Sequence, residues 1–147
     1  DNTGISIYNK HLKAGFILDH PTINKIVDDS IKQLSIKTPS MQQHIENLSG
    51  GNQQKVIVSR WLANDPEILI MDEPTRGIDV GAKHEIYEIM EQLADQGKSI
   101  IMISSEMPEL LGMADRVYVM CNGKITGEID QKEDMTQEKV MSFATQF

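Results

Sequence analysis

A chain of 147 residues is long enough for one domain with a modest hydrophobic core. Its net charge of −8 argues against a nucleic-acid-binding surface, because such a surface needs clustered Lys and Arg. A single cysteine excludes a disulfide framework, and no apolar run approaches the roughly 20 residues that span a bilayer, so we expect any membrane association to run through a partner.

The N-terminal part of the chain predicts one helix. Residues 1–16 carry neither a cap nor a strand signal, and we expect them to be irregular or weakly extended. From Pro21 to Leu34, apolar residues recur at the three- and four-residue spacing of an amphipathic helix. Pro39 then breaks this pattern.

Residues 48–55, with the sequence Leu-Ser-Gly-Gly-Asn-Gln-Gln-Lys, have the features of a phosphate-binding turn. The glycines let the backbone approach a bound group closely, and Ser49 is a good N-cap for a helix from about Asn52 to Leu62. A helix start with free N–H groups, a hydroxyl and no bulky side chain favours a phosphate, although such a run is also common in ordinary loops. We expect four residues of this helix to face a core: Val56, Ile57, Trp61 and Leu62.

Residues 68–71 are apolar and lead directly into Asp72 and Glu73. This predicts a buried strand that delivers two carboxylates at its C-terminal end, where open α/β sheets bind their ligands. In a phosphate site, Asp72 would hold Mg²⁺ and Glu73 would position or deprotonate the attacking water. The alternative is a solvated turn or a helix cap.

The remaining residues alternate between helix and strand signals. A helix from Ala82 to about Gln96 closes at Gly97, and an Asn-Gly pair at positions 122 and 123 predicts a hairpin turn. The other expected elements are a second buried strand over 99–104, a short helix over 107–113, hairpin strands over 117–121 and 125–129, and a last helix over 137–145. This order predicts an α/β fold in which helices flank a parallel sheet and an antiparallel hairpin follows.

The run at 48–55 and the strand that ends in Asp72 and Glu73 are followed by Pro-Thr-Arg-Gly-Ile-Asp-Val-Gly-Ala at 74–82. In this order, the three motifs resemble the signature, Walker B strand and D-loop of the ABC ATPase family. Further details at 52–55, 75–83 and 104–110 are similar to one branch, the tandem ATP-binding subunits of bacterial galactoside and ribose importers. The match runs from about residue 36 to 129. It implies the P-loop NTPase-like fold of an ABC ATPase.

No Gly-x-x-x-x-Gly-Lys-Ser/Thr run occurs in the sequence, so the loop that cradles a triphosphate and its strand are missing. We therefore expect the C-terminal part of a longer subunit, inactive as an ATPase by itself. By the resemblance, residues 1–47 form part of the helical subdomain after an irregular segment, and residues 48–147 form the signature helix, Walker B strand, D-loop and the C-terminal part of the core.

ABC ATPase domains pair head to tail, so the resemblance divides the site residues between two nucleotides. Asp72 (for Mg²⁺) and Glu73 (catalytic) would face the nucleotide of this domain's own P-loop. The residues that would reach the ATP of a partner domain are Leu48, Ser49, Gly50, Gly51, Asn52, Gln53 and Asp79. Asp79 also fits an N-cap, and both roles can coexist.

Counting back from the Ala-Asp-Arg run at 114–116 puts Ser105 at the position of the family's switch histidine. A serine is too short both to contact the γ-phosphate and to orient the water, so this catalytic position is degenerate. The alternative is that Ser105 only ends a strand. Either way, we expect an impaired local site and a working signature.

The resemblance implies the energy-coupling subunit of a sugar importer, with ATP and Mg²⁺ as cofactors, at the cytoplasmic face of the bacterial inner membrane. Its implied partners are an N-terminal ATPase domain of the same polypeptide, a transmembrane permease and, indirectly, a periplasmic sugar-binding protein. Two alternatives stay open: an ABC ATPase of DNA repair or translation, against which the acidic charge counts, and a non-catalytic interaction module of the same fold.

Overall fold

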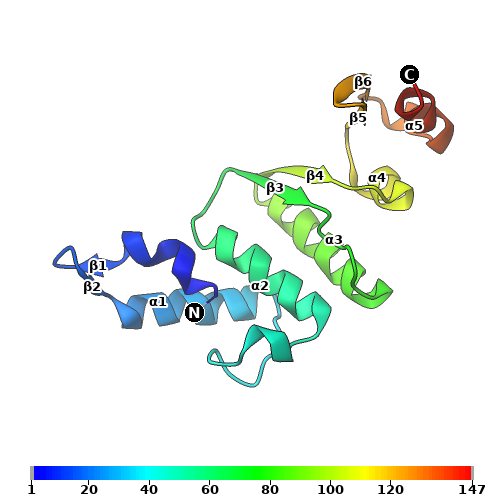
Figure 1. The fold of residues 1–147 in the computed structure, drawn as a ribbon. Coiled ribbons are helices and arrows are strands. Elements are labelled where there is room, and N and C mark those ends of the chain that lie inside the picture. The colour runs from blue at the N-terminus through cyan, green and yellow to red at the C-terminus, as the bar shows by residue number, and fades with distance from the viewer. Residues whose placement is uncertain (1, 147) are drawn as a thin grey trace. The chain divides into compact units, whose positions relative to one another are not determined.

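The computed structural model describes residues 2–146, which divide into two compact units between Ile101 and Met102 (Figure 1). The first unit carries helices α1 to α3, and the second carries α4 and α5. No helix among the described residues is both long and apolar enough to cross a membrane.

The first region of the first unit is more ordered than the sequence indicates. Its elements are η1 (Gly4–Lys10), β1 (Leu12–Lys13), β2 (Ile17–Leu18) and α1 (His20–Gln33). The expectation of an irregular segment up to residue 16 is therefore wrong for the described residues; η1 is a 3-10 helix that packs on α1 and α2 and buries Ile7 completely. Its N-cap, Thr3, makes no side-chain cap hydrogen bond and instead meets the Ser59 hydroxyl of α2 at 3.0 Å.

The predicted signature helix is α2 (Gly50–Leu62), which follows the short turn η2 (Ile45–Asn47). It ends as expected before Asp65, whose backbone is left-handed at φ 51°. The expected core face is wrong in part, because Ile57 and Trp61 are 42% and 56% exposed. The buried face of α2 is instead formed largely by small and polar residues: Gly51, Asn52, Lys55, Val56, Val58 and Ser59.

The strand, helix and strand of the parallel sheet are β3 (Ile68–Asp72), α3 (Val80–Asp95) and β4 (Ser99–Ile103). The apolar face predicted for α3 is confirmed, and Gly97 follows it with φ 87°. The expectation of a fully buried β3 is wrong. Leu69 and Met71 are buried, whereas Ile68 and Ile70 are 59% and 66% exposed, so the described residues cover only one face of this strand.

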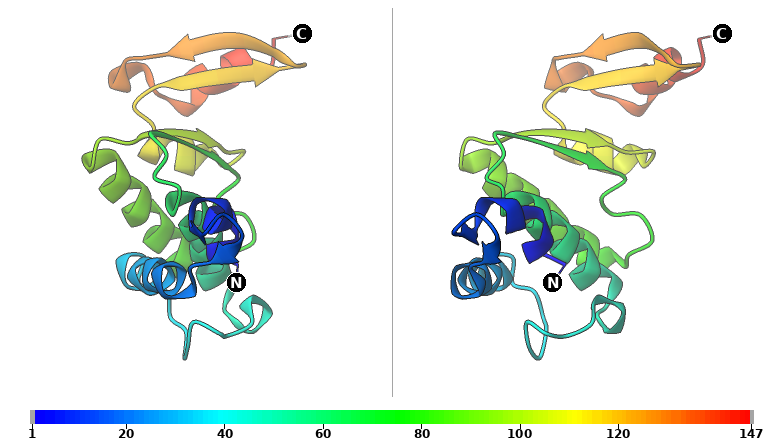
Figure 2. Two further views of the ribbon diagram at one scale, coloured as in Figure 1. Left: turned by 90° about the vertical axis from the view of Figure 1, so that its left-hand side faces the viewer. Right: turned by 60° about the vertical axis from the view of Figure 1, so that its left-hand side comes forward.

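The second unit is a hairpin covered by a helix. Its elements are α4 (Met107–Met113), β5 (Val117–Cys121), β6 (Lys124–Ile129), η3 (Lys132–Asp134) and α5 (Gln137–Ala144). The predicted Asn-Gly turn is confirmed, since both residues have positive φ angles of 50° and 76°. Both views of Figure 2 show α5 lying along the hairpin, where Val140 joins Val117, Val119, Ile129 and Met135 in one core. Cys121 is only half-buried.

Gly127 on β6 is where α5 comes closest to the hairpin. A Cβ atom at this position would lie 2.2 to 2.5 Å from three ring carbons of Phe143. The hydroxyl of Thr126 holds the same turn of α5 by donating to the Phe143 carbonyl at 2.9 Å.

We expect Gly127→Ala to lower the free energy of unfolding by about 1 to 3 kcal/mol, because the ring must leave its place on the strand. Urea unfolding measures this. The control is Gly112→Ala on α4, where the added Cβ meets nothing within 4 Å and helix propensity favours alanine by up to about 1 kcal/mol. Equal stability of the wild type and Gly127→Ala would show that Phe143 does not pack on the glycine.

Candidate functional site

The glycines at positions 50 and 51 bring the start of α2 against the start of α3. A Cβ atom at Gly51 would lie 2.5 Å from the Cβ of Ala82, and one at Gly50 would lie 3.3 Å from a methyl group of Ile78. Gly51 is therefore fixed by the neighbouring helix, whereas Gly50 is exposed. This contact joins the two predicted motifs, the signature and the D-loop, at one edge.

Two N-cap residues stand at this edge. Ser49 occupies the N-cap position of α2 in an extended conformation without a side-chain cap hydrogen bond, and Asp79 caps α3 by accepting a hydrogen bond from the Ala82 backbone N–H at 2.9 Å. The N-cap role considered for Asp79 is thus confirmed. Because Ser49 is exposed and the N-terminus of α2 carries partial positive charge, the start of α2 suits an anion that approaches from outside the chain, whereas the start of α3 is already satisfied by the Asp79 carboxylate.

The remaining signature side chains are held within the chain. The amide of Gln53 donates to the Leu48 carbonyl at 2.8 Å, which fixes the backbone just before the helix. Asn52 is 9% exposed and donates from Nδ2 to the Ser49 hydroxyl at 2.8 Å. Their place in the motif suggests that both amides point outward to a nucleotide, but neither does.

An ion pair clamps α2 to α3 one turn further along. The Nζ atom of Lys55 is 2.8 Å from Glu85 on α3 and donates to the Ser35 carbonyl at 3.3 Å. Lys55 is only 3% exposed, so its charge depends on these partners. Its hydrogen bond and its positive charge lower the pKa of the Glu85 carboxyl. Sequence analysis missed this residue, because a lysine in a motif is read as a surface group.

The predicted carboxylate pair lies where β3 ends. Asp72 is exposed at the last position of the strand, and Glu73 has a left-handed backbone with φ 46°. This conformation costs a residue with a side chain about 1 to 2 kcal/mol. Gln54 of α2 donates to the Pro74 carbonyl at 2.8 Å, which ties the signature helix to the turn after Glu73.

Ser105 lies in the second unit, exposed, in the turn between β4 and α4. Its neighbour Ser104 donates from Oγ to Glu109 and accepts the Glu106 backbone N–H at 3.0 Å. Glu109 is 4% exposed and sits three residues after the N-cap of α4. The sequence does not mark this pair as a capping motif, because the N-cap of α4 is Glu106 rather than a serine or threonine.

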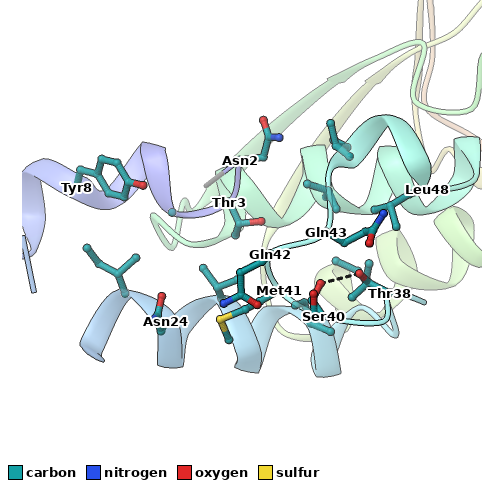
Figure 3. Close-up of a pocket in the computed structure, with 17 residues that line it drawn as sticks. Asn2, Thr3, Tyr8, Asn24, Thr38, Ser40, Met41, Gln42, Gln43 and Leu48 are labelled. Atoms are coloured by element: carbon teal, nitrogen blue, oxygen red, sulfur yellow. Dashed lines mark hydrogen bonds between the residues drawn. The ribbon is translucent and has the colours of Figure 1, made fainter. Parts of the chain in front are cut away.

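A cavity of about 230 Å³ opens between η1, α1 and the segment before α2 (Figure 3). None of the 17 residues that line it is charged. Amide and hydroxyl groups of Asn24, Gln42 and Thr38 alternate there with apolar side chains. A triphosphate is usually held by cationic side chains, and none lines this cavity, so it is a poor nucleotide site.

The donors present suit Mg²⁺ only in part. No group of three His, Cys, Asp or Glu residues is arranged to hold a metal within residues 2–146. Asp72 alone fits a Mg²⁺ ion that takes its other ligands from water and phosphate, which is how this ion is usually bound beside nucleotides.

A sequence model of the ABC transporter family matches residues 3–76, half of the chain. The chain belongs to the ABC transporter family. The resemblance inferred from the motifs is confirmed. The fold agrees: the structure of an ATP-binding cassette of an ABC transporter superposes with a TM-score of 0.79, covering 97% of this chain and 60% of that one at 24% identity.

Curated relatives are closer in sequence. The chain is 56% identical over its whole length to the galactose/methyl galactoside import ATP-binding protein MglA of Clostridium tetani, and covers 29% of it. Over 84% of its length it is 58% identical to the ribose import ATP-binding protein RbsA of the same species, and covers 24% of it. The chain thus spans less than a third of these relatives.

We expect the free energy of unfolding of Glu85→Gln to depend less on pH in the acid range than that of the wild type. Because the pKa of Glu85 is lowered in the folded protein, its pairing stabilises the folded state at pH values above 4.5, the pKa of this group in the unfolded chain. This stabilisation is lost as the pH falls below 4.5 and through the lower pKa of the folded protein. The difference in unfolding free energy between wild type and variant should therefore be largest near neutral pH and shrink in acid. Urea unfolding from about pH 7 to pH 3 measures it.

The matched control is Glu91→Gln, an exposed position on the same helix. It removes the same charge without touching Lys55, so its stability curve should keep the wild-type shape. A Glu85→Gln curve parallel to that of wild type would contradict the clamp.

Proposed function

We propose that this chain is part of the ATP-binding subunit of a bacterial monosaccharide importer, and that it contributes a signature edge to a nucleotide held by a partner ATPase domain. The observation that carries this is the approach of Gly51 to Ala82, which brings together the two helix starts that the exposed residues Ser49 and Asp79 precede. The relatives are named for the import of galactose and of ribose, which supports the substrate class.

The residues at this edge have separate tasks in the proposal. Ser49 donates its hydroxyl to the γ-phosphate, and the backbone N–H groups of Gly50 and Gly51 add the partial positive charge of the helix start. Leu48, Asn52 and Gln53 shape the turn. Asp79 contacts the paired domain while it caps α3.

The carboxylates belong to a second nucleotide, the one bound by this domain's own P-loop. Asp72 would hold its Mg²⁺, and Glu73 would orient the attacking water. Ser105 stands where the family has a histidine, and its short side chain leaves this second site weak in catalysis. The composite site completed by Ser49 then carries most of the hydrolysis.

The proposed partners follow from this division of work. The paired ATPase domain lies in the same polypeptide, N-terminal to this chain, and closure of the pair on ATP is transmitted to a transmembrane permease. Residues before 48, as part of the helical subdomain, contact the permease, while residues from 48 onward belong to the ATPase core. The subunit is therefore peripheral, on the cytoplasmic face of the inner membrane, and a periplasmic binding protein delivers the sugar.

We expect the 147-residue chain to bind Mg-ATP weakly or not at all, because its sequence offers neither the backbone cradle nor the lysine of a P-loop. Calorimetric titration measures this. Saturable binding tighter than about 100 μM, or roughly −5.5 kcal/mol, would show that the nucleotide site lies elsewhere in the chain.

In the full-length subunit assembled with its permease, we expect Ser49→Arg to reduce ATP hydrolysis by orders of magnitude, since it puts a bulky side chain into the working site. Glu73→Gln should reduce it only a few-fold, because its site already has Ser105 at the histidine position. Steady-state hydrolysis rates compare the two, with each tenfold loss equal to about 1.4 kcal/mol. A larger loss from Glu73→Gln would overturn the division between the sites.

A further inference from the structure

The side chain of Asn52 has only one possible orientation. Its Oδ1 atom accepts a hydrogen bond from the backbone N–H of Lys37 at 2.7 Å. A backbone N–H can only donate, so the atom that faces it must be the amide oxygen. The Nδ2 group is therefore the end that faces Ser49, 2.8 Å from its hydroxyl oxygen.

This orientation decides what the Ser49 hydroxyl can do. An amide NH₂ group only donates, so Ser49 Oγ must be the acceptor of that hydrogen bond. Its own proton cannot point back to Asn52. The hydroxyl makes no cap hydrogen bond to α2, and within residues 2–146 its only hydrogen bond is the one it accepts from Asn52. Because Ser49 is exposed, the proton is directed outward from the edge.

We propose that Asn52 is a positioning residue that makes Ser49 an obligate hydrogen-bond donor toward the phosphate of the nucleotide. The inference rests on the proposed function. In this inference Asn52 does not contact the nucleotide itself but supports Ser49 from a buried position. The hydrogen bond from Asn52 also polarises the hydroxyl, which strengthens its donation to an anion.

The same amide links the site to a distant part of the chain. Lys37 lies in the segment that joins α1 to η2, 15 residues before Asn52. A displacement of that segment would break the bond that fixes the amide. Ser49 would then be free to rotate its proton away from the phosphate. The orientation of the donor is thus tied to the position of the segment that follows α1.

The test uses the full-length subunit assembled with its permease and Mg-ATP as the probe. Asn52→Asp keeps the shape and the acceptor for Lys37 but replaces the NH₂ donor by an oxygen. The Ser49 hydroxyl then donates to that carboxylate instead of the phosphate. We expect kcat to fall at least tenfold in this variant. A kcat within twofold of wild type would overturn the inference.

The carboxyl group of the variant also gives a pH signature. When protonated, it carries an O–H that can donate to Ser49 in place of the lost amide. The activity of Asn52→Asp relative to wild type should therefore rise as pH falls. The matched control is Asn122→Asp, the same change at an exposed position of the hairpin turn, where aspartate also suits the positive φ, and it should keep wild-type kcat and pH profile. A flat relative profile of Asn52→Asp would contradict the donor argument.

A double-mutant cycle with Ser49→Ala separates positioning from general damage. If Asn52 acts through Ser49, then adding Asn52→Asp to Ser49→Ala should change kcat by less than twofold. Equal losses in both backgrounds would overturn the positioning role and leave the proposed function standing. Wild-type hydrolysis by Ser49→Ala alone would overturn the proposed function, and the inference with it.

Discussion

The close approach of α2 to α3 is the constraint on which the first unit depends. With no side chain at position 51, the backbone of α2 comes within van der Waals distance of Ala82. The buried pair of Lys55 and Glu85 then fixes the rotation of one helix against the other. A larger residue at 51 would separate the helix starts, and with them the two caps that form the edge.

The buried face of α2 is polar, and this makes its packing specific. Asn52 bonds to Ser49 and Lys37, Lys55 pairs with Glu85, and the Ser59 hydroxyl meets that of Thr3 at 3.0 Å. Apolar side chains tolerate small rotations, whereas a buried hydrogen bond is lost when its partner moves. Displacing α2 therefore carries a high free-energy cost along the whole length of the helix. The hydroxyl direction that we propose for Ser49 depends on that rigidity.

Periodicity and turn chemistry were enough to locate most elements, because α3, the hairpin turn and α5 carry strong local signals. The 3-10 helix η1 was missed, since it is held by contacts with distant residues: the buried Ile7 and the hydrogen bonds of Thr3 and Ser6 to α2. The exposure of Ile57 and Trp61 could not be predicted either, because hydrophobicity alone does not say which face meets a neighbour. At the site, the motif located Ser49 and Asp79. The inward turn of Asn52 depends on Lys37, a partner from a segment whose position no local pattern fixes.

The left-handed backbone of Glu73 places two demands on one position. The conformation favours glycine, which would relieve the strain and stabilise the turn, while only a side chain can supply a carboxylate there. In the role proposed for Glu73, the residue gives up stability in exchange for a carboxylate at this place. A β-branched substitute would add a steric penalty to the loss of charge, so variants at this position report on catalysis alone only when they keep an unbranched side chain of the same length.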